Sequence, residues 1–191
     1  MFKAGEGAGR SGSFFFFSHD NKFLIKTMTK GELTLFLSIL PAYIDHFIKN
    51  PNSLLAKIWG VFTVISKTMH KVHIMVMENT LRLNNPEHLR YVFDLKGSTV
   101  DRFVSGATKP STTLKDVNFV AACKQHDYLM KFPEAKKTRL KIGLAKDLEF
   151  LQKWNLMDYS LLLAIERRAT ARRPTDFQVN RVTQKTFAGN L

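Results

Sequence analysis

A lysine on a predicted strand, followed by a glutamate on a predicted helix, is the first candidate for chemistry in this sequence. Lys26 ends the apolar run Phe23-Leu24-Ile25, and Glu32 lies in the first turns of the helix that follows. The Gly- and Ser-rich stretch from Gly5 to Ser13 precedes both residues, and its backbone N–H groups could approach a phosphate closely. This combination can bind a nucleotide. Taken singly, however, the loop also fits a linker, and Lys26 fits an edge-strand charge.

Two further segments place charged side chains beside buried strands. Asp94 and Lys96 are two residues apart, so they share one side of an extended chain, and the turn sequence Gly97-Ser98-Thr99 follows them. Asp158 stands at the mouth of the apolar run that begins at Tyr159. A carboxylate there is costly unless it is paired, hydrated or functional, which makes it a candidate for catalysis. The alternative for Asp158 is ordinary turn chemistry between a helix and a strand.

Hydrophobic periodicity predicts the elements that position these residues. Phe14 to Phe17 and Phe23 to Lys26 indicate a hairpin with a polar tip. Thr29 and Glu32 have capping-box spacing ahead of a helix that Pro41 should kink or divide. The apolar stripe of this helix is predicted as Leu33, Phe36, Leu37, Leu40, Ile44 and Phe47.

The remaining predicted elements alternate between strands and helices. Strands are expected at 58–65, 72–77, 91–95 and 159–165, the last being the final strong strand. One helix, capped by Ser111 or Thr113, should run through Leu114, Val117, Val120 and Ala121, and a longer one should carry the stripe Leu140, Leu144, Leu148 and Leu151. The basic, mostly polar tail 167–191 carries no predicted element.

The composition limits which class of protein this is and which kinds of partner it can be expected to bind. The chain has 191 residues, 45% of them apolar, which suffices for one sizeable core or two small lobes. A net charge of +13 indicates a polyanionic partner or, alternatively, a solvated basic surface. Nucleic acid is not expected, because no recognition motif is present. The single cysteine, Cys123, excludes an internal disulfide and is interpreted as a small core residue. No run is long enough to span a membrane, so we expect a cytosolic protein with peripheral membrane contact.

Five motifs together resemble the phosphatidylinositol phosphate kinases: SGSFFFFS, FLIKT, LPAY, FDLKGST followed by an arginine, and MDYSLL, in this order. The segments LKD at Leu114 and KDLEFL at Lys146 are similar to family segments as well. The resemblance covers roughly Gly9 to Ile165. It implies an α+β, protein-kinase-like fold of two lobes, with an N-lobe over residues 1–81 and a partial C-lobe over 82–166.

The resemblance also implies roles for individual residues. The loop at Gly9, Arg10, Ser11 and Gly12 would lie over the phosphates of ATP, and Lys26, held by Glu32, would contact them. The segment Met77-Glu78-Asn79 would meet adenine through its backbone. Asp94 and Lys96 would serve the reacting phosphates and the lipid headgroup. Asp158 would orient or deprotonate the attacking inositol hydroxyl.

The implied reaction transfers phosphate from ATP, with Mg²⁺, to phosphatidylinositol 4-phosphate on the cytosolic face of the plasma membrane. The alternatives are a 4-kinase acting on the 5-phosphate and a non-catalytic lipid-binding module. The family's Ile-Ile-Asp metal segment is not recognisable, and Asp176 is the one candidate to replace its aspartate. Because the family also has strands before the glycine loop, we expect the chain to be a fragment, a truncated product or a short form.

Overall fold

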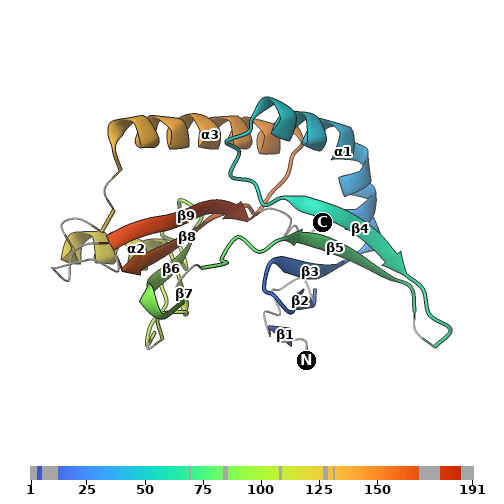
Figure 1. The fold of residues 1–191 in the computed structure, drawn as a ribbon, viewed down its shortest axis with the longest axis horizontal. Coiled ribbons are helices and arrows are strands. Elements are labelled where there is room, and N and C mark those ends of the chain that lie inside the picture. The colour runs from blue at the N-terminus through green and yellow to red at the C-terminus, as the bar shows by residue number, and fades with distance from the viewer. Residues whose placement is uncertain are drawn as a thin grey trace.

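Two β-sheets with three α-helices make up the part of the chain that the structure describes (Figure 1). The structure is a computed structural model, and it describes residues 4–5, 13–68, 70–83, 86–107, 109–126, 129–130, 132–167 and 177–185. Strands β1 to β5 form the first sheet and β6 to β9 the second. The fold is therefore α+β, as predicted. Among the described residues, none of the helices is long and apolar enough to cross a membrane.

The first sheet is antiparallel, with strand order β1-β2-β3-β5-β4. Its strands are β1 Ala4–Gly5, β2 Phe15–Phe17, β3 Phe23–Met28, β4 Ile58–Val64 and β5 Val72–Glu78. The predicted hairpin is confirmed as β2 and β3, and the strands predicted at 58–65 and 72–77 are confirmed as β4 and β5, which pair with each other. At the tip of the first hairpin, Asp20 accepts hydrogen bonds from the Ser18 hydroxyl and the Lys22 N–H, and these bonds lower the pKa of Asp20 to about 2.

Helix α1, Lys30–Lys49, begins at the predicted capping box. The N–H of Glu32 donates to Thr29 Oγ1, and the N–H of Thr29 donates to Glu32 Oε2. The prediction that Pro41 could divide the helix is wrong, because α1 is continuous through it. Pro41 leaves the carbonyl of Leu37 without its helical donor, but both residues lie on the exposed side, where water can replace that bond.

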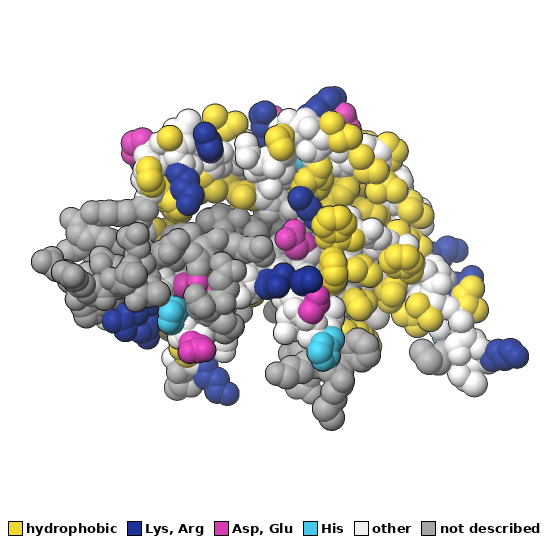
Figure 2. Space-filling view, viewed as in Figure 1, with side chains coloured by type: hydrophobic (Ala, Val, Ile, Leu, Met, Phe, Trp, Pro, Cys, Tyr) yellow, Lys and Arg dark blue, Asp and Glu magenta, His cyan; other side chains and the backbone are white. Residues whose placement is uncertain are grey.

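The buried face of α1 differs from the predicted stripe. Phe36 is buried as predicted, and Leu33, Leu40 and Phe47 pack partly buried against the core, but Leu37 and Ile44 are exposed. The buried residues are Phe36, Ile39, Tyr43 and His46. Leucine and isoleucine occur on both sides of this helix, so periodicity alone could not select the inner face. Figure 2 shows the result as apolar side chains gathered over α1 and β4.

The second sheet has strand order β7-β6-β8-β9. Its pairs are antiparallel except for β6 with β7. The sheet and its neighbouring short helices comprise η1 Pro86–His88, β6 Leu89–Leu95, β7 Thr113–Leu114, α2 Asp116–Gln125, β8 Ser160–Arg167 and β9 Phe177–Lys185.

Three sequence predictions about this half of the chain are wrong. The second helix begins at Asp116 and not near Ser111 or Thr113, because Thr113–Leu114 pairs with β6 as β7. The tail after Glu166 contains β9, which pairs along the whole of β8, so Tyr159–Ile165 is not the last strand. Cys123 is exposed, because α2 turns its neighbour Ala122 inward.

The longest C-terminal helix, α3 Glu134–Lys153, packs against α1 and joins the core of the first sheet. Its buried residues are Gly143, Asp147, Phe150 and Leu151, so the predicted stripe holds at Leu151 but not at Leu148, which is exposed. Phe150, Leu151 and Leu156 share one buried cluster with residues of β3, α1 and β5. Figure 1 shows α1 and α3 along the same edge, above both sheets.

Candidate active site

The predicted Lys26–Glu32 pair forms at the junction of β3 and α1. Lys26 is 3% exposed and lies opposite the fully buried Met75 of β5. Its Nζ lies 2.9 Å from Glu32 Oε1, while Glu32 Oε2 accepts the N–H of Thr29 at 2.7 Å. Burial would raise the pKa of Glu32, but these hydrogen bonds outweigh it and lower that pKa below its ordinary value. The glutamate therefore stays ionised and fixes the ammonium in place.

The predicted adenine-contacting segment lies at the end of β5. Met77 is buried opposite Leu24, whereas Asn79 follows the strand. The N–H of Glu78 donates to the carbonyl of Lys57, and the N–H of Asn79 donates to that of Lys22. Both N–H groups are thus used within the protein, so an adenine contact at these two residues would need their carbonyl oxygens instead.

Lys96 and Asp158, which are 62 residues apart in the sequence, form an ion pair. β6 ends at Leu95, which is paired with Leu161 of β8, and this register brings the two flanking segments together. The Lys96 side chain is 32% exposed and that of Asp158 51% exposed, so both can be reached from solvent. The structure thus unites two of the three residues predicted for catalysis.

The backbone at Asp158 is unusual. Its φ of +60° lies in the left-handed region, which costs free energy for a residue with a side chain. Ser160, two residues further along the chain, is buried at the start of β8. The Asp158 carboxylate is half-exposed and faces Lys96, and backbone in sparsely populated regions of this kind clusters at functional sites.

Asp94, the third predicted residue, has a different partner. It lies on β6 opposite Leu162, and its Oδ2 is 3.3 Å from Nη2 of Arg102, which also donates to the Asp94 carbonyl. Asp94 and Lys96 therefore lie on one strand end but engage different charges. Asp94 is held by an arginine to which no role had been assigned.

Arg102 and Asp116 belong to the same cluster of charges, and the sequence reasoning did not single them out. One oxygen of Asp116, Oδ1, accepts the N–H groups of Lys96 at 3.0 Å and Gly97 at 2.8 Å. The other, Oδ2, accepts Nε of Arg102 at 2.8 Å. Gly97 has a φ of +73°, a conformation suited to glycine. The available signal was that both residues fall in the family-like segments FDLKGST-to-arginine and LKD.

Electrostatics in this cluster favour the charged forms. Burial would raise the pKa of Asp116, but hydrogen bonds from Arg102 and the Gly97 N–H outweigh it, and the pKa lies below its ordinary value. Burial would lower the pKa of Arg102, but its bonds to Asp116 and Asp94 raise it instead. Asp116 thus positions the turn that carries Lys96 while Arg102 ties that turn to Asp94.

A buried polar cluster connects α1 to α3. The Asp147 carboxylate, fully buried, lies 2.7 Å from His46 Nε2 and accepts the Ser53 hydroxyl and the Leu54 N–H, each also at 2.7 Å. At Gly143, an added Cβ would lie 3.0 Å from the carbonyl oxygen of Asn52, so the α3 backbone approaches this loop closely.

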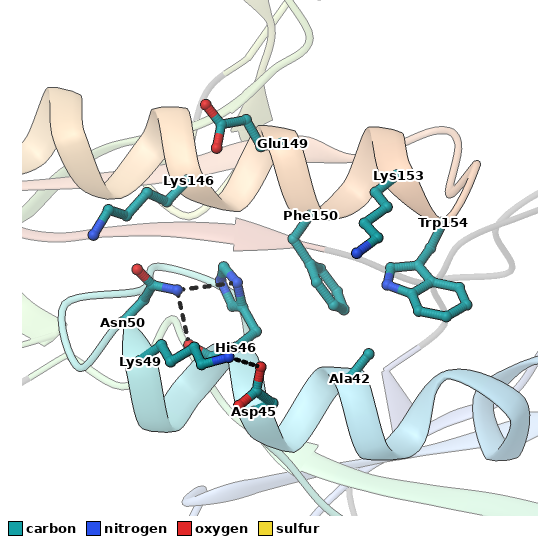
Figure 3. Close-up of a pocket in the computed structure, with 10 residues that line it drawn as sticks. All are labelled: Ala42, Asp45, His46, Lys49, Asn50, Lys146, Glu149, Phe150, Lys153 and Trp154. Carbon is teal, nitrogen blue, oxygen red and sulfur yellow. Dashed lines mark hydrogen bonds and ion pairs between the residues drawn. The ribbon is translucent and has the colours of Figure 1, made fainter.

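Aromatic packing continues this connection. Figure 3 shows Phe150 reaching from α3 toward α1 beside His46, with ring centroids 4.7 Å apart. Around it lies an open cavity of about 450 Å³ that none of the predicted site residues lines. The connection matters for the site because α1 carries Glu32 at its start and α3 leads directly into the turn that ends at Asp158.

Comparison with known proteins establishes the family of this chain. The family model described as phosphatidylinositol-4-phosphate 5-kinase matches residues 2–189. The chain belongs to this family. It is 42% identical over 159 residues to a probable phosphatidylinositol phosphate kinase of Dictyostelium discoideum, covering 82% of this chain and 21% of that protein. It is 40% identical over 162 residues to phosphatidylinositol 4-phosphate 5-kinase 7 of Arabidopsis thaliana, covering 84% and 20%.

A mammalian relative gives a similar result. The chain is 37% identical to the mouse phosphatidylinositol 4-phosphate 5-kinase type-1 beta over 159 residues, which cover 82% of this chain and 28% of the mouse protein. The chain thus spans about a fifth to a quarter of the length of these curated relatives. The family match extends past Ile165, where the sequence motifs end, and includes the tail with β9.

Some of the residues predicted for this kinase family fall outside the described part of the chain. These are the loop residues Gly9, Arg10, Ser11 and Gly12 and the metal candidate Asp176. Within the described residues, no group of three or more His, Cys, Asp or Glu side chains could hold a metal ion. Asp94 and Asp158 each face a cation instead, so the described residues alone do not fit a complete Mg²⁺ site.

Proposed function

We propose that this chain is the nucleotide- and headgroup-binding part of a lipid kinase with two lobes. The first sheet with α1 would form one lobe and the second sheet with α2 the other, with the boundary near residue 81, between β5 and β6. ATP would bind between them. Its phosphates would meet Lys26, which a buried glutamate already holds in position. Phosphoryl transfer requires mainly alignment and neutralised charge, so preformed cations of this kind are what the reaction needs.

The observation that carries the proposal is the Lys96–Asp158 ion pair on a second, separate strand end. In the reaction, an inositol hydroxyl oxygen forms a bond to the γ-phosphorus, the bond from that phosphorus to the β,γ-bridging oxygen breaks, and ADP leaves. Asp158 would accept the hydroxyl proton. Lys96 would bind a phosphate group of the lipid or of ATP. Mg²⁺, when bound, would neutralise charge on the transferred phosphate.

We infer that the substrate is phosphatidylinositol 4-phosphate and the product the 4,5-bisphosphate, because the Arabidopsis and mouse relatives are named as 5-kinases of that lipid. A net charge of +13 supports peripheral binding to the anionic cytosolic face of the plasma membrane. The 4-kinase acting on phosphatidylinositol 5-phosphate remains the competing specificity.

Calorimetric titration with Mg²⁺-ATP tests the nucleotide half of this proposal. Lys26→Ala should weaken binding, because it removes a phosphate-binding ammonium and leaves Glu32 without its cation. Lys22→Ala is the matched control, because Lys22 is an exposed hairpin-tip lysine paired only across a surface turn. Equal affinity of a folded Lys26→Ala variant and the parent chain would remove Lys26 from the site.

Product analysis tests the lipid half. The full-length protein is incubated with ATP and vesicles that contain either the 4-phosphate or the 5-phosphate lipid, and the position of the new phosphate is determined. A 4,5-bisphosphate formed only from the 5-phosphate lipid would establish the 4-kinase reaction instead. ATP binding and phosphoinositide-selective vesicle binding without any product would favour the non-catalytic module.

A further inference from the structure

Three highly exposed apolar side chains lie on the two segments that the Lys96–Asp158 ion pair joins. Val100 is 76% exposed, Phe103 59% and Met157 74%. Met157 directly precedes Asp158, and Val100 and Phe103 lie in the segment that follows Lys96. Because the ion pair joins these two segments, the three side chains flank one site. Exposed apolar groups that gather beside a polar site mark an interaction surface more often than scattered ones do.

The segment that carries Val100 and Phe103 is held in place by its own contacts. Arg102 binds Asp94 and Asp116, while the N–H and carbonyl of Val104 both bind the Asn118 side chain. Phe103 lies between these two tethered residues. The Arg102 side chain is 11% exposed whereas Phe103 is 59% exposed, so Arg102 is anchored inward while Phe103 reaches solvent.

The charges near these apolar side chains are mixed. Lys96 pairs with Asp158, and Arg102 pairs with Asp94 and Asp116, while Lys109 and Lys115 lie further along the same segment. In a chain with a net charge of +13, exposed apolar side chains of this kind can enter the headgroup region of an anionic bilayer. By contrast, the apolar surface over α1 and β4 (Figure 2) contains none of the predicted site residues.

We propose that Val100, Phe103 and Met157 form an apolar wedge that inserts into the boundary between headgroups and acyl chains of an anionic membrane. The inserted wedge holds Lys96 and Asp158 at the depth of the lipid headgroups. This inference rests on the proposed function, because a lipid substrate keeps its acyl chains in the bilayer while its headgroup reaches the site. It adds an apolar contribution to the electrostatic one expected from net charge.

Vesicle cosedimentation tests the wedge. The triple variant Val100→Ser/Phe103→Ser/Met157→Ser is compared with a control, Ile48→Ser/Ile65→Ser/Ile142→Ser, whose three residues are 74%, 72% and 53% exposed elsewhere. The vesicles contain phosphatidylserine, with and without phosphatidylinositol 4-phosphate at matched surface charge. The wedge variant should lower the partition coefficient on both vesicle types by about tenfold, equal to about 1.4 kcal/mol. The control should leave it unchanged.

A fluorescence measurement reports insertion directly. Phe103→Trp should become blue-shifted and quenched when vesicles with brominated acyl chains are added, whereas Ile142→Trp on the outer side of α3 should not. A folded wedge variant with unchanged partitioning, or an unquenched tryptophan at position 103, overturns the wedge. If the phosphoinositide advantage persists in that case, the proposed function stands without it. If position 103 inserts but phosphatidylinositol 4-phosphate does not increase vesicle binding, the wedge is supported and headgroup recognition is rejected.

Discussion

Substitution of Asp116 offers the sharpest test of how the site is built. In Asp116→Asn, the remaining oxygen can keep the two bonds from the N–H groups of Lys96 and Gly97, since both are made to Oδ1. The new amide nitrogen replaces Oδ2 and faces Nε of Arg102, so a donor meets a donor. The substitution therefore removes one ion pair while it preserves the shape and the turn.

The size of the effect follows from these contacts. Loss of one charge-assisted hydrogen bond in a mostly buried site should lower the free energy of unfolding by about 1.5 to 3 kcal/mol. Asp116→Ala loses all three bonds and leaves Arg102 with Asp94 alone, so about 3 to 5 kcal/mol is expected. The matched control is Asp45→Asn, which removes an exposed pair with Lys49 and should cost at most about 1 kcal/mol.

Urea unfolding between pH 7 and pH 3 measures these differences. Because the pKa of Asp116 is lower in the folded protein than its ordinary 3.8, the folded state binds fewer protons, and the stabilisation is complete above that value. It is lost as pH falls through the folded-state pKa, so the gap between wild type and Asp116→Asn should shrink on acidification. A gap that is absent at pH 7, or that stays constant down to pH 3, would refute the assigned contacts.

Two further predictions concern the helix connection and the chemical step. Asp147→Asn should lower the free energy of unfolding by about 3 to 5 kcal/mol in the same urea assay, because three polar groups converge on a fully buried carboxylate. A loss of stability as small as that of Asp45→Asn would contradict this cluster. Asp158→Asn in the full-length protein should reduce kcat by about 10²- to 10⁴-fold with little change in ATP affinity. Steady-state kinetics measures kcat, and calorimetry measures the affinity. If the variant is active, another residue must act as the base, and Asp94 is the first candidate.

Local sequence signals predicted the part of the site that depends on neighbouring residues. The capping box at Thr29 and Glu32 fixes the start of α1, and that start in turn places Glu32 beside Lys26. The meeting of Lys96 and Asp158, which are 62 residues apart, followed from the family resemblance and not from a local signal.

The parts that the sequence did not reveal depend on distant partners. The strand β9 is polar and forms because β8 offers it an edge, so its own composition gave no signal. The role of Asp116 depends on Arg102 and on a turn 19 residues away. The buried face of α1 depends on α3 as well as on the first sheet: His46 lies inside against Asp147 and Phe150 of α3, and Ile44 lies outside.

The packing of α3 into the first core has a consequence for synthesis of the chain on the ribosome. His46 and Asp147 are 101 residues apart. At a synthesis rate of about 5 to 20 residues per second, the helix that completes the core of the first sheet is made roughly 5 to 20 seconds after α1. During that interval Phe36, Ile39 and Met75 lack part of their cover. Contacts this distant also slow folding after release, because the intervening chain must be closed first. The first sheet therefore keeps apolar surface exposed during synthesis until α3 has been made.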